Sequence, residues 1–593
     1  MVSFTQLHVR HSLPAFVFLF LIGLLSGPAH ALEVQVNAPK ELKPILEQHL
    51  ETARAARLKE ALTEEELVRL QQASLETARE LLATEGYFSP QITSTIERAG
   101  EDSVVRYEVE AGPRTLIGTV NIRFEGALTD ESQDKTSQRN KRLRERIKRD
   151  FALKPEMPFR QTDWGAAKNT ALRPLLQMGY PAARLASSEA KIDPATQRAT
   201  LSLVIDSGPA FFYGPVQISG NQRYPASVIE ALNPTAPGEP FRQQQLQDYQ
   251  QALDASGYFS LVTVRVEPDP LLAAAAPILV TVTERKEQQL SFGVGYSTDT
   301  GARVQATYLN RDIFDAGQRL KLELKLEHLE NTALIELAWP RTARGYENRA
   351  SLSYDQQDIE GQHTESGKAV IGRNRKRDRI DSTLSLQYQI ENQTVGTTVN
   401  EQNQALSLGY AWTHRTDGRA FYPVRGHVTN LQVSVASDAL LSDTSFLRLY
   451  GRHTEFFKLG EKGRLILRGE LGAVIADRRE GIPTDFLFRA GGENSVRGYQ
   501  YQSLGLNVPG GVASVRDLAT ASVEYNYFFT PTWGAALFVD AGDAADSFDQ
   551  LAPAVGVGVG ARYKSPIGPI NVDLAYGEKT GDVLLQFELG VAF

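Results

Sequence analysis

Residues 485–499 read Asp485-Phe-Leu-Phe-Arg-Ala-Gly-Gly-Glu-Asn-Ser-Val-Arg-Gly-Tyr499. They lie within 478–516, the longest stretch of the C-terminal half that lacks strand-like alternation. A loop of this length inside a compact domain is usually either functional or disordered. The apolar and aromatic side chains of 485–499 argue against disorder. The glycines among them permit sharp reversals of the backbone, so we expect a folded loop.

Arg497 has unusual neighbours for a loop arginine. It stands between Val496 and the pair Gly498-Tyr499. A cation in that setting is either exposed or held by carboxylates, because an unpaired buried charge costs much free energy. These four residues alone do not distinguish a specific site from an ordinary surface loop. The sequence on either side of the loop makes that distinction.

The sequence of 287–593 alternates with period two almost throughout. Phe292 and Tyr296 share one face of the first predicted strand, and Gly293 and Gly295 lie on its other face. A soluble sandwich also alternates, but strands of about ten residues that are apolar outside and polar inside are typical of a transmembrane β-barrel. We count sixteen such segments, an even number as in bacterial barrels. The sequence therefore predicts a 16-stranded antiparallel transmembrane β-barrel, in which the long loop follows strand eleven on the external side.

The first half of the chain alternates helical and strand patterns in three copies. Each copy contains a helix that ends at a Gly-Tyr pair and is followed by two strands, and the glycines are Gly86, Gly179 and Gly257. The regular return of this pattern along the chain indicates an array of α+β units, each large enough for helices on a three-stranded sheet. We place the units at 32–112, 113–209 and 210–286. The second unit carries a basic insertion at 139–149, which is either a solvated helical face or a patch that binds lipid or a partner.

Residues 1–31 have the pattern of a secretory signal peptide. Arg10 precedes a short apolar run, and Ala29-His30-Ala31 matches a cleavage site. The mature chain is therefore expected to begin at Leu32, outside the cytoplasm. The chain has no cysteine, which excludes disulfides and thiolate metal sites. With 71 Asp and Glu against 63 Lys and Arg, nucleic acid is not an expected partner.

Together these features resemble the bacterial outer-membrane assembly superfamily that includes BamA (the surface antigen family), over essentially all of the chain after residue 31. The three units are similar to polypeptide-transport-associated (POTRA) modules, which are periplasmic units of order β-α-α-β-β. Three modules before a sixteen-stranded barrel resemble the TamA branch of this family, the translocation and assembly module subunit.

The resemblance implies a lock between loop and barrel. The sixth-loop motif of the family matches Val496-Arg497-Gly498-Tyr499, the Phe-x-Asp-x-Gly motif of strand thirteen matches Phe538, Asp540 and Gly542, and the glutamate of strand twelve matches Glu524. Alternation also places Glu524 and Asp540 on the inner faces of adjacent strands. A guanidinium fork suits two carboxylates, so we expect Arg497 to be held there.

Closing the barrel requires 287–297 to pair with 581–593. This predicted seam contains Gly293, Gly295 and Gly590, and glycine weakens a strand. A weakly paired seam could accept a strand from a client protein, although these small residues could also serve only to fit a crowded lumen. The terminal Phe593 resembles the signal by which barrel proteins are recognised for insertion.

The function implied by the resemblance is a non-enzymatic insertase or translocase that assists autotransporters and other β-barrel proteins in the outer membrane, without cofactor or metal. The implied partners are a TamB-like inner-membrane-anchored periplasmic protein, nascent barrel clients and outer-membrane lipids. The sequence has no P-loop. Two alternatives stay open: a diffusion or secretion channel with periplasmic docking modules, and a barrel enzyme. His453 is the one histidine in a clearly predicted strand, and no catalytic cluster is apparent.

Overall fold

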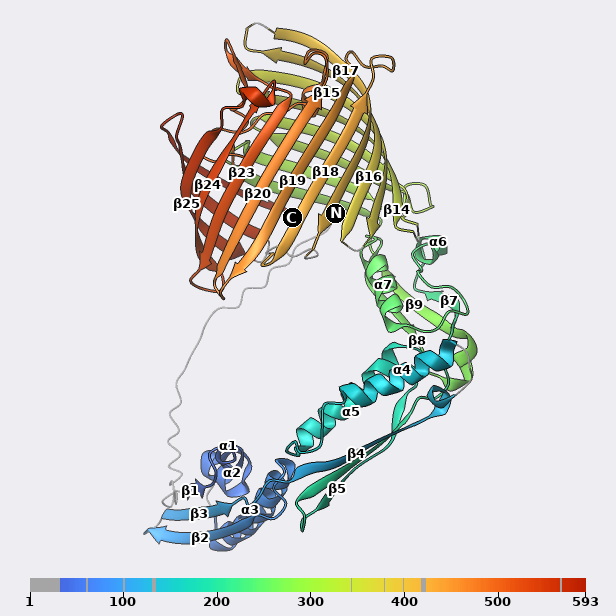
Figure 1. Ribbon diagram of the computed structural model, residues 1–593, viewed down its shortest axis with the longest axis vertical. Helices are drawn as coiled ribbons and strands as arrows, with labels where there is room; N and C mark the ends of the chain where they lie inside the picture. Colours follow the sequence, from blue (N-terminus) through green and yellow to red (C-terminus); the bar gives the residue numbers. More distant parts are fainter. Residues whose placement is uncertain are drawn as a thin grey trace, which may run out of the picture. The chain divides into compact units, whose positions relative to one another are not determined.

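The computed structural model describes residues 32–59, 62–99, 102–130, 135–342, 344–377, 379–397, 399–416, 423–565 and 568–592. The predicted signal peptide at 1–31 and the terminal Phe593 lie outside these residues. The chain forms two compact units, and each is described by itself (Figure 1). One comprises the residues up to Phe211 with Pro268–Ala273, and the other comprises Phe212–Glu267 with the residues from Ala274 on.

Three α+β modules precede the barrel, two in the first unit and one at the start of the second. Module 1 contains β1 (Leu32–Asn37), α1 (Lys43–His49), α2 (Glu51–Leu58), α3 (Glu64–Thr84), β2 (Gln91–Ala99) and β3 (Asp102–Glu110). Module 2 contains β4 (Leu116–Glu125), η1 (Gly126–Thr129), α4 (Lys135–Asp150), α5 (Gln161–Gln177), β5 (Arg184–Asp193) and β6 (Arg198–Asp206). Module 3 contains β7 (Tyr213–Ser219), α6 (Ala226–Glu230), α7 (Gln243–Asp254), β8 (Phe259–Val266), η2 (Pro270–Ala275) and β9 (Ala276–Glu284).

The three sheets share one topology. Their strand orders are β1-β3-β2, β4-β6-β5 and β7-β9-β8. In each sheet the first strand is parallel to the central strand, and the other edge strand is antiparallel to it. A parallel pair needs a crossover connection, and the helices between the first and second strands supply it.

Helix α3 of module 1 ends just before Gly86-Tyr87, as the sequence predicts. Thr63 and Glu66 form the capping box that opens α3, with the Thr63 hydroxyl accepting from the Glu66 N–H. Gly86 follows the last turn with a positive φ of 95°, which glycine adopts without steric cost. Leu82 of this helix is fully buried against the sheet residues Val105 and Tyr107, so the amphipathic pattern forms the core of the module.

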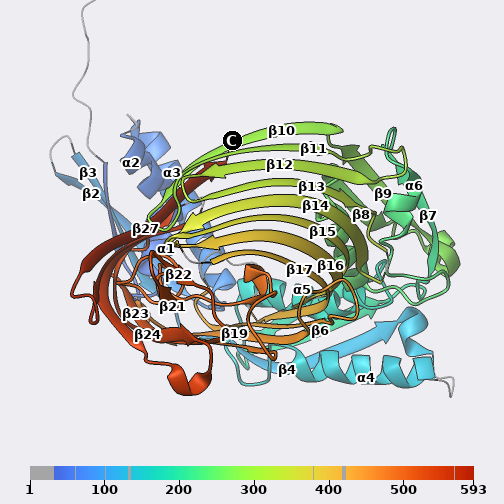
Figure 2. The same ribbon diagram turned by 90° about the horizontal axis from the view of Figure 1, so that it is seen from above.

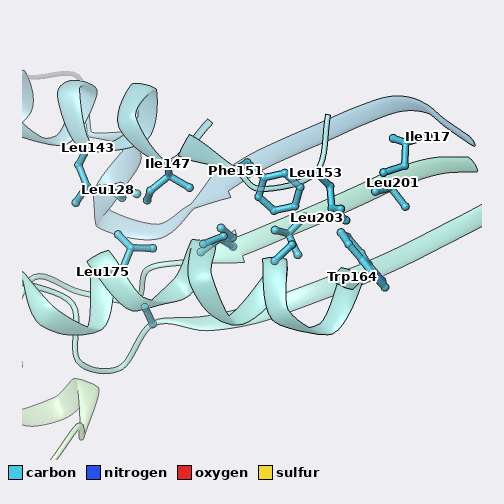
Figure 3. Packing of buried hydrophobic residues seen from close by; sticks show 14 of the residues in the cluster. Ile117, Leu128, Leu143, Ile147, Phe151, Leu153, Trp164, Leu175, Leu201 and Leu203 are labelled. Carbon is cyan, nitrogen blue, oxygen red and sulfur yellow. The ribbon is translucent and has the colours of Figure 1, made fainter. Parts of the chain in front are cut away.

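The basic run at 139–149 is not an insertion, contrary to the prediction. It forms most of α4, the first helix of module 2 in the same topology as the other modules. Leu143 and Ile147 are buried against the sheet, and one turn separates them, so a single narrow apolar stripe holds the helix. Figure 3 shows both side chains in the layer between α4 and the strands. Such a short stripe within a charged run explains why the sequence pattern was misinterpreted.

The predicted barrel of sixteen antiparallel strands is confirmed. Its strands are β10 (Gln288–Ser297), β11 (Gly301–Asn310), β12 (Arg319–Glu327), β13 (Glu330–Ala338), β14 (Tyr346–Ile359), β15 (Gln362–Arg377), β16 (Ile380–Val395), β17 (Val399–Arg415), β18 (Gly426–Ala436), β19 (Phe446–Leu459), β20 (Gly463–Ile475), β23 (Asp517–Phe528), β24 (Trp533–Ala545), β25 (Ala554–Ser565), β26 (Gly568–Gly577) and β27 (Val583–Ala592). Neighbours in the chain pair in order, and Figure 2 shows β10 to β17 side by side. Among the described residues, no helix combines the length and the apolar character needed to span a membrane.

Module 3 contacts the barrel at the turn between β11 and β12. The Tyr258 hydroxyl donates to the Gly317 carbonyl over 2.5 Å, and Arg311 Nε donates to the Gly257 carbonyl over 2.8 Å. Arg319 Nη1 also donates to the Ser256 carbonyl over 3.0 Å. This turn follows the second barrel strand, so connections after even-numbered strands lie on the side of module 3. Connections after odd-numbered strands, including the one after β20, lie on the opposite side.

Candidate functional site

The connection between β20 and β23 folds back into the barrel lumen. It contains η3 (Thr484–Phe486) and a small hairpin of β21 (Leu506–Val508) and β22 (Gly511–Ala513). Phe486 packs on Phe446 and Phe488 on Tyr450, with ring centroids 4.9 and 6.1 Å apart. Both partner residues are on β19, so the loop is a packed part of the barrel interior. We call residues 476–516 the long loop.

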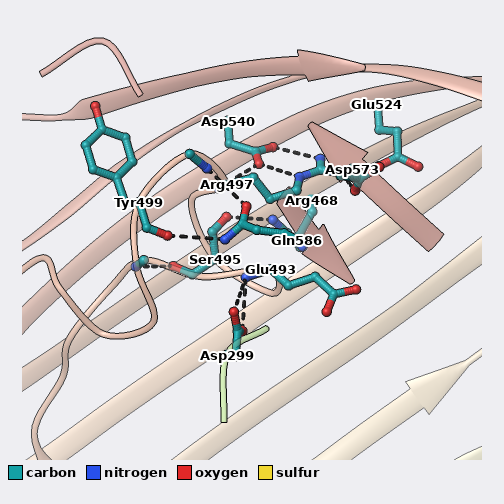
Figure 4. Close-up of polar contacts among 12 residues, drawn as sticks. Asp299, Arg468, Glu493, Ser495, Arg497, Tyr499, Glu524, Asp540, Asp573 and Gln586 are labelled. Atoms are coloured by element: carbon teal, nitrogen blue, oxygen red, sulfur yellow. Dashed lines mark hydrogen bonds and ion pairs between the residues drawn. The ribbon is translucent and has the colours of Figure 1, made fainter. Parts of the chain in front are cut away.

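Arg497 of the long loop is 4% exposed and lies against the inner wall of the barrel. Its Nε and Nη2 donate to Asp540 over 2.7 and 3.0 Å, and its backbone N–H donates to the same carboxylate over 3.1 Å. Its Nη1 donates to Glu524 over 2.7 Å and to Asp573 over 2.9 Å. The structure therefore brings Arg497, Glu524 and Asp540 together and adds a third carboxylate (Figure 4).

A second arginine completes this charge cluster. Arg562 on β25 donates to Asp573 over 2.5 Å and pairs with Glu524 over 3.0 Å. The cluster thus contains two guanidinium groups and three carboxylates, and all five side chains are mostly buried. Buried charges are tolerated where each is paired and hydrogen-bonded. The arrangement can hold a loop firmly.

The remaining residues of the predicted motifs fill the space around Arg497. The Phe538 ring lies under the guanidinium, 3.4 Å from its carbon to the ring centroid, a cation–π contact. Val496 is fully buried in a small cluster with Tyr499 and Ala554. Gly542 on β24 faces Thr520, whose side chain would lie 2.8 Å from an added Cβ.

Alternate glycines on β25 make room for this cluster. A Cβ at Gly556 would lie 1.8 Å from the Arg497 carbonyl oxygen, and one at Gly558 would lie 2.3 Å from the Phe538 ring. A Cβ at Gly560 would lie 1.8 Å from the Asp573 carboxylate. The sequence shows these glycines opposite a row of valines, but the pattern alone did not reveal what occupies the space.

The backbone after Arg497 binds the last barrel strand. The Gly498 N–H donates to Gln586 Oε1 over 3.1 Å, and Gln586 Nε2 donates to the Tyr499 carbonyl over 3.2 Å. The Tyr499 hydroxyl donates to the Val555 carbonyl over 3.0 Å. Gly498 has a φ of 91° and lies so close to Gly577 that an added Cβ would be 2.8 Å from its nitrogen, so this position requires glycine.

The same segment also contacts the connection that follows the first barrel strand. The Glu493 N–H donates to both carboxylate oxygens of Asp299, over 3.1 and 3.3 Å. Asp299 lies two residues after the end of β10, whereas Gln586 lies in β27. Figure 4 shows both contacts. We call residues 493–499 the clasp segment, because it is hydrogen-bonded to residues at both sides of the seam.

The seam itself is short. In the described chain, β27 pairs with β26 only over Val583–Phe587 and with β10 only over Glu588–Ala592, opposite Gly293–Ser297. Gly295 faces Gly590 in this register, and the exposed Tyr296 ring stacks on Phe587 at 5.6 Å. Phe292 lies beyond the paired region, and the predicted seam residue Phe593 lies outside the described residues. The last strand therefore changes neighbour halfway along its length.

Sequence reasoning missed several residues of this site. Asp573, Arg562, Gln586 and Asp299 all contact the long loop or its partners. Alternation marks Asp573 and Gln586 as inward, because their neighbours Leu574 and Leu585 are exposed. Many other polar residues share that inward pattern, so alternation alone could not select these four.

Three histidines lie close together on the neighbouring strands β17, β18 and β19. His414 and His427, like the predicted His453, lie in strands, and Nδ1 of His414 is 2.8 Å from Nε2 of His427. His453 and His427 both approach Glu455, at 3.3 and 3.8 Å. Within the described ranges, no group of three or more histidine, cysteine, aspartate or glutamate residues has a geometry that could hold a metal ion.

The chain is similar to known outer-membrane assembly proteins. A model of the POTRA family, described as surface antigen variable number repeat, matches residues 211–285. The outer membrane protein assembly factor BamA of Nitratidesulfovibrio vulgaris is 24% identical over 524 residues, which cover 83% of this chain and 63% of that protein. The BamA of Neisseria meningitidis serogroup B is 23% identical over 609 residues, which cover 88% of this chain and 72% of that protein.

A solved structure shows the same fold. BamA from Haemophilus ducreyi lacking POTRA domains 1-3 has a TM-score of 0.65 and 16% identity, covering 81% of this chain and 100% of that one. A model of the Omp85 superfamily domain matches residues 286–593, more than half of the chain and the whole barrel. The chain therefore belongs to the Omp85 superfamily, with its barrel in the bacterial outer membrane and its N-terminal modules in the periplasm.

Proposed function

We propose that this chain is an outer-membrane insertase and translocase subunit of the TamA type. It assists the assembly and secretion of autotransporters and other β-barrel proteins, and it works with a TamB-like periplasmic protein anchored in the inner membrane. The observation that carries the proposal is the short seam between β10 and β27, held on the inner side by the clasp segment.

The seam offers an incomplete strand edge. Residues 288–292 of β10 face no residue of β27 in the described part of the chain. Backbone N–H and C=O groups without partners cost several kcal/mol each in hydrocarbon. A client strand that pairs with β10 would satisfy these groups, so the seam favours strand addition. Each new hydrogen bond replaces one that was unmade, and the process needs neither nucleotide nor cofactor.

The two ends of the clasp segment are held with different strengths. On the β27 side, Arg497 makes charge-assisted bonds to three carboxylates, and these bonds are roughly twice as strong as neutral ones. On the β10 side, the uncharged backbone N–H of Glu493 donates to the Asp299 carboxylate. The weaker contact breaks first, so the seam opens by release of β10 while β27 stays with the long loop.

A disulfide across the seam tests this proposal. Val294 faces Val591 in the register, and paired Cα atoms lie within the ~7 Å that a disulfide needs. The chain has no native cysteine, so Val294→Cys with Val591→Cys would form one defined crosslink. We expect the oxidised protein to stay in the membrane but to stop inserting an unfolded autotransporter barrel, and reduction should restore insertion.

A second crosslink on the same strand provides the control. Val294 also faces Val304 of β11, so Val294→Cys with Val304→Cys fixes β10 to its other neighbour without closing the seam. This protein should insert clients as the wild type does. Full activity of the seam-crosslinked protein would exclude strand addition at the seam, and a large stable conductance that neither crosslink alters would favour a diffusion channel.

A further inference from the structure

Two arginines on the outer wall of the barrel lie against one tyrosine ring. The guanidinium carbons of Arg373 and Arg375, near the end of β15, are 4.4 and 4.8 Å from the centroid of the Tyr346 ring on β14. The register places Tyr346 directly opposite Arg375. Ile371, on the same face of β15, is 68% exposed, so this is the face that meets lipid. Both arginines therefore point away from the lumen.

No carboxylate balances these two charges in the described part of the chain. On the inner face, Lys376 and Arg415 both pair with Asp381, at 3.9 and 2.6 Å. Arg373 and Arg375 form no ion pair with any described residue, and the buried Nε of Arg375 has no hydrogen-bond partner among these residues. Like charges repel each other, whereas a shared aromatic face attracts both. The ring thus holds two cations ready for an anion.

The arginine pair lies where the membrane meets the periplasm. β15 is the sixth strand of the barrel, so its end lies on the side of module 3. Trp339, directly after β13, donates its N–H to the Asn348 carbonyl on β14 over 3.0 Å. Trp412 on β17 faces Ser382 on β16, and Ser382 faces Arg375. Because tryptophan is enriched at membrane–water interfaces, these neighbours place the arginines at the depth of lipid headgroups.

An apolar hollow of about 560 Å³ lies on the same outer wall, farther into the membrane. It extends across β10 to β14, where Ala306 and Ala333 stand among larger apolar side chains. Leu352 lines it on β14, four residues along that strand from Asn348, which faces Arg373. Four residues of strand span ~13 Å, and one leaflet of hydrocarbon is about 15 Å thick. An acyl chain can therefore reach the hollow from a headgroup at the arginines.

We propose that Arg373 and Arg375 bind the phosphate of an anionic phospholipid in the periplasmic leaflet, and that an acyl chain of this lipid occupies the hollow. Guanidinium groups bind phosphate oxygens through bidentate, charge-assisted hydrogen bonds. A free phosphate ion would use the same two arginines, but only a lipid also uses the hollow. The site concerns the outer wall alone and does not depend on how the seam functions.

The test measures lipid binding to the full chain in detergent by native mass spectrometry. We expect phosphatidylglycerol to bind at least tenfold more tightly than the zwitterionic phosphatidylcholine. Arg373→Gln with Arg375→Gln should weaken phosphatidylglycerol binding about tenfold or more, because each arginine near a bilayer surface adds to the attraction of anionic lipid. Lys458→Gln with Lys462→Gln is the matched control. It removes two exposed charges at the turn after β19, on the same side of the barrel, and should leave binding unchanged.

A second variant distinguishes a lipid from a free phosphate ion. Ala333→Phe partly fills the hollow, so it should weaken the binding of long-chain phosphatidylglycerol about threefold or more. Dihexanoyl phosphatidylglycerol, whose chains are too short to reach the hollow, should bind more weakly to the wild type and should not respond to Ala333→Phe. Inorganic phosphate should displace the long-chain lipid only in large excess.

Four results would overturn the proposal. Equal binding of phosphatidylglycerol and phosphatidylcholine would exclude recognition of the anionic headgroup. An equal loss in the two double variants would show general attraction to the basic end of the barrel. Unchanged binding of the long-chain lipid to Ala333→Phe would exclude the hollow as the site of the chain. Displacement of the lipid by an equal concentration of inorganic phosphate would assign the arginines to a free phosphate ion.

Discussion

Arg497 shows what a guanidinium can do that an ammonium cannot. Its Nε and Nη2 donate to Asp540 on β24, and its Nη1 donates to Glu524 on β23 and to Asp573 on β26. Lysine is a point charge on a flexible stem and cannot present a planar fork. The Phe538 ring beneath the guanidinium adds a face that favours a flat cation. The residue therefore ties three strands of the inner wall to one loop.

Replacing Arg497 tests the hold on the loop. Arg497→Ala leaves Glu524, Asp540 and Asp573 with one fewer cation, and breaking a buried ion pair typically costs ~3–5 kcal/mol. We expect the barrel to insert, but with a lower melting temperature, faster trypsin cleavage within 476–516 and reduced client assembly. Arg497→Lys should give results between those of the wild type and of Arg497→Ala, because lysine keeps the positive charge but lacks the planar guanidinium group. An alanine variant that matches the wild type in all three assays would exclude the lock.

At the scale of elements, β25 is shaped by what lies on it. Gly556, Gly558 and Gly560 alternate with valines, so one face of β25 is lipid-exposed and the other has no side chains at these positions. Gly556 admits the long-loop backbone at Arg497, Gly558 admits the Phe538 ring, and Gly560 admits the Asp573 carboxylate. These glycines cost strand stability, and the contacts of Arg497 and Phe538 offset that cost.

A single methyl group on β25 should displace the loop. Gly556→Ala places a Cβ 1.8 Å from the Arg497 carbonyl oxygen, and overpacking of this kind typically costs ~1–3 kcal/mol. We expect trypsin cleavage of the long loop to accelerate while the barrel stays inserted. Gly469→Ala on β20 is the control, because nothing lies within 4 Å of its added Cβ. If both variants resist trypsin equally, the loop does not depend on this close approach.

The elements were more predictable than their register. Period-two alternation and strand parity predict sixteen strands and the position of the long loop, because lipid on one side and a polar lumen on the other impose that pattern. The same alternation cannot predict that Asp573 rather than another inward carboxylate reaches Arg497, since that depends on strand stagger. Nor does it show that β27 changes neighbour after Phe587. The identity of α4 was missed because only Leu143 and Ile147 carry its apolar stripe.

At the scale of the whole molecule, the repeated Gly-Tyr pairs lie at junctions. The Gly86 carbonyl accepts from the Thr115 N–H at the start of module 2, and the Gly179 carbonyl accepts from the Phe211 N–H at the end of it. The Gly257 carbonyl accepts from Arg311 of the barrel. In modules 1 and 2 the end of the last helix thus also binds the segment that follows the sheet, and in module 3 it binds the barrel turn after β11. This use of one motif explains why the pair recurs at each repeat.

Tyr258 should set the stability of the junction between module 3 and the barrel. Burial raises the pKa of Tyr258 to about 12, because the phenolate is poorly solvated there. Tyr258→Phe removes the hydrogen bond to Gly317, which is worth about 1 kcal/mol. We expect faster amide exchange in the turn 311–319 below pH 10. Tyr354→Phe, on an exposed barrel residue, should leave that exchange unchanged.

The pH dependence of the junction has a defined sign. The folded-state pKa of Tyr258 lies above the value of about 10 for an exposed tyrosine. The protonated Tyr258 hydroxyl therefore stabilises the junction fully below pH ~10, and this stabilisation is lost as pH rises through the folded-state pKa. The difference in exchange between the wild type and Tyr258→Phe should narrow over that interval. A constant difference across it would show that the phenol does not act through its proton.

Module 1 should be removable without loss of the barrel. All residues of its core lie within 32–111, so its deletion leaves the other cores complete. The contacts that cross into module 2 include the Gly86–Thr115 and Glu85–Arg114 hydrogen bonds, an ion pair of 2.7 Å between Glu85 and Arg160, and the packing of Phe88 on the module 2 core. We expect a chain without 32–112 to insert into the outer membrane and to keep module 2 folded, because domains with separate cores and small interfaces tolerate such cuts.

If module 1 is the docking site of the inner-membrane-anchored partner, copurification of that partner from crosslinked cells should be lost, while the seam disulfide between positions 294 and 591 should still form. A truncated chain that still copurifies with the partner would place the docking site in module 2, module 3 or the barrel.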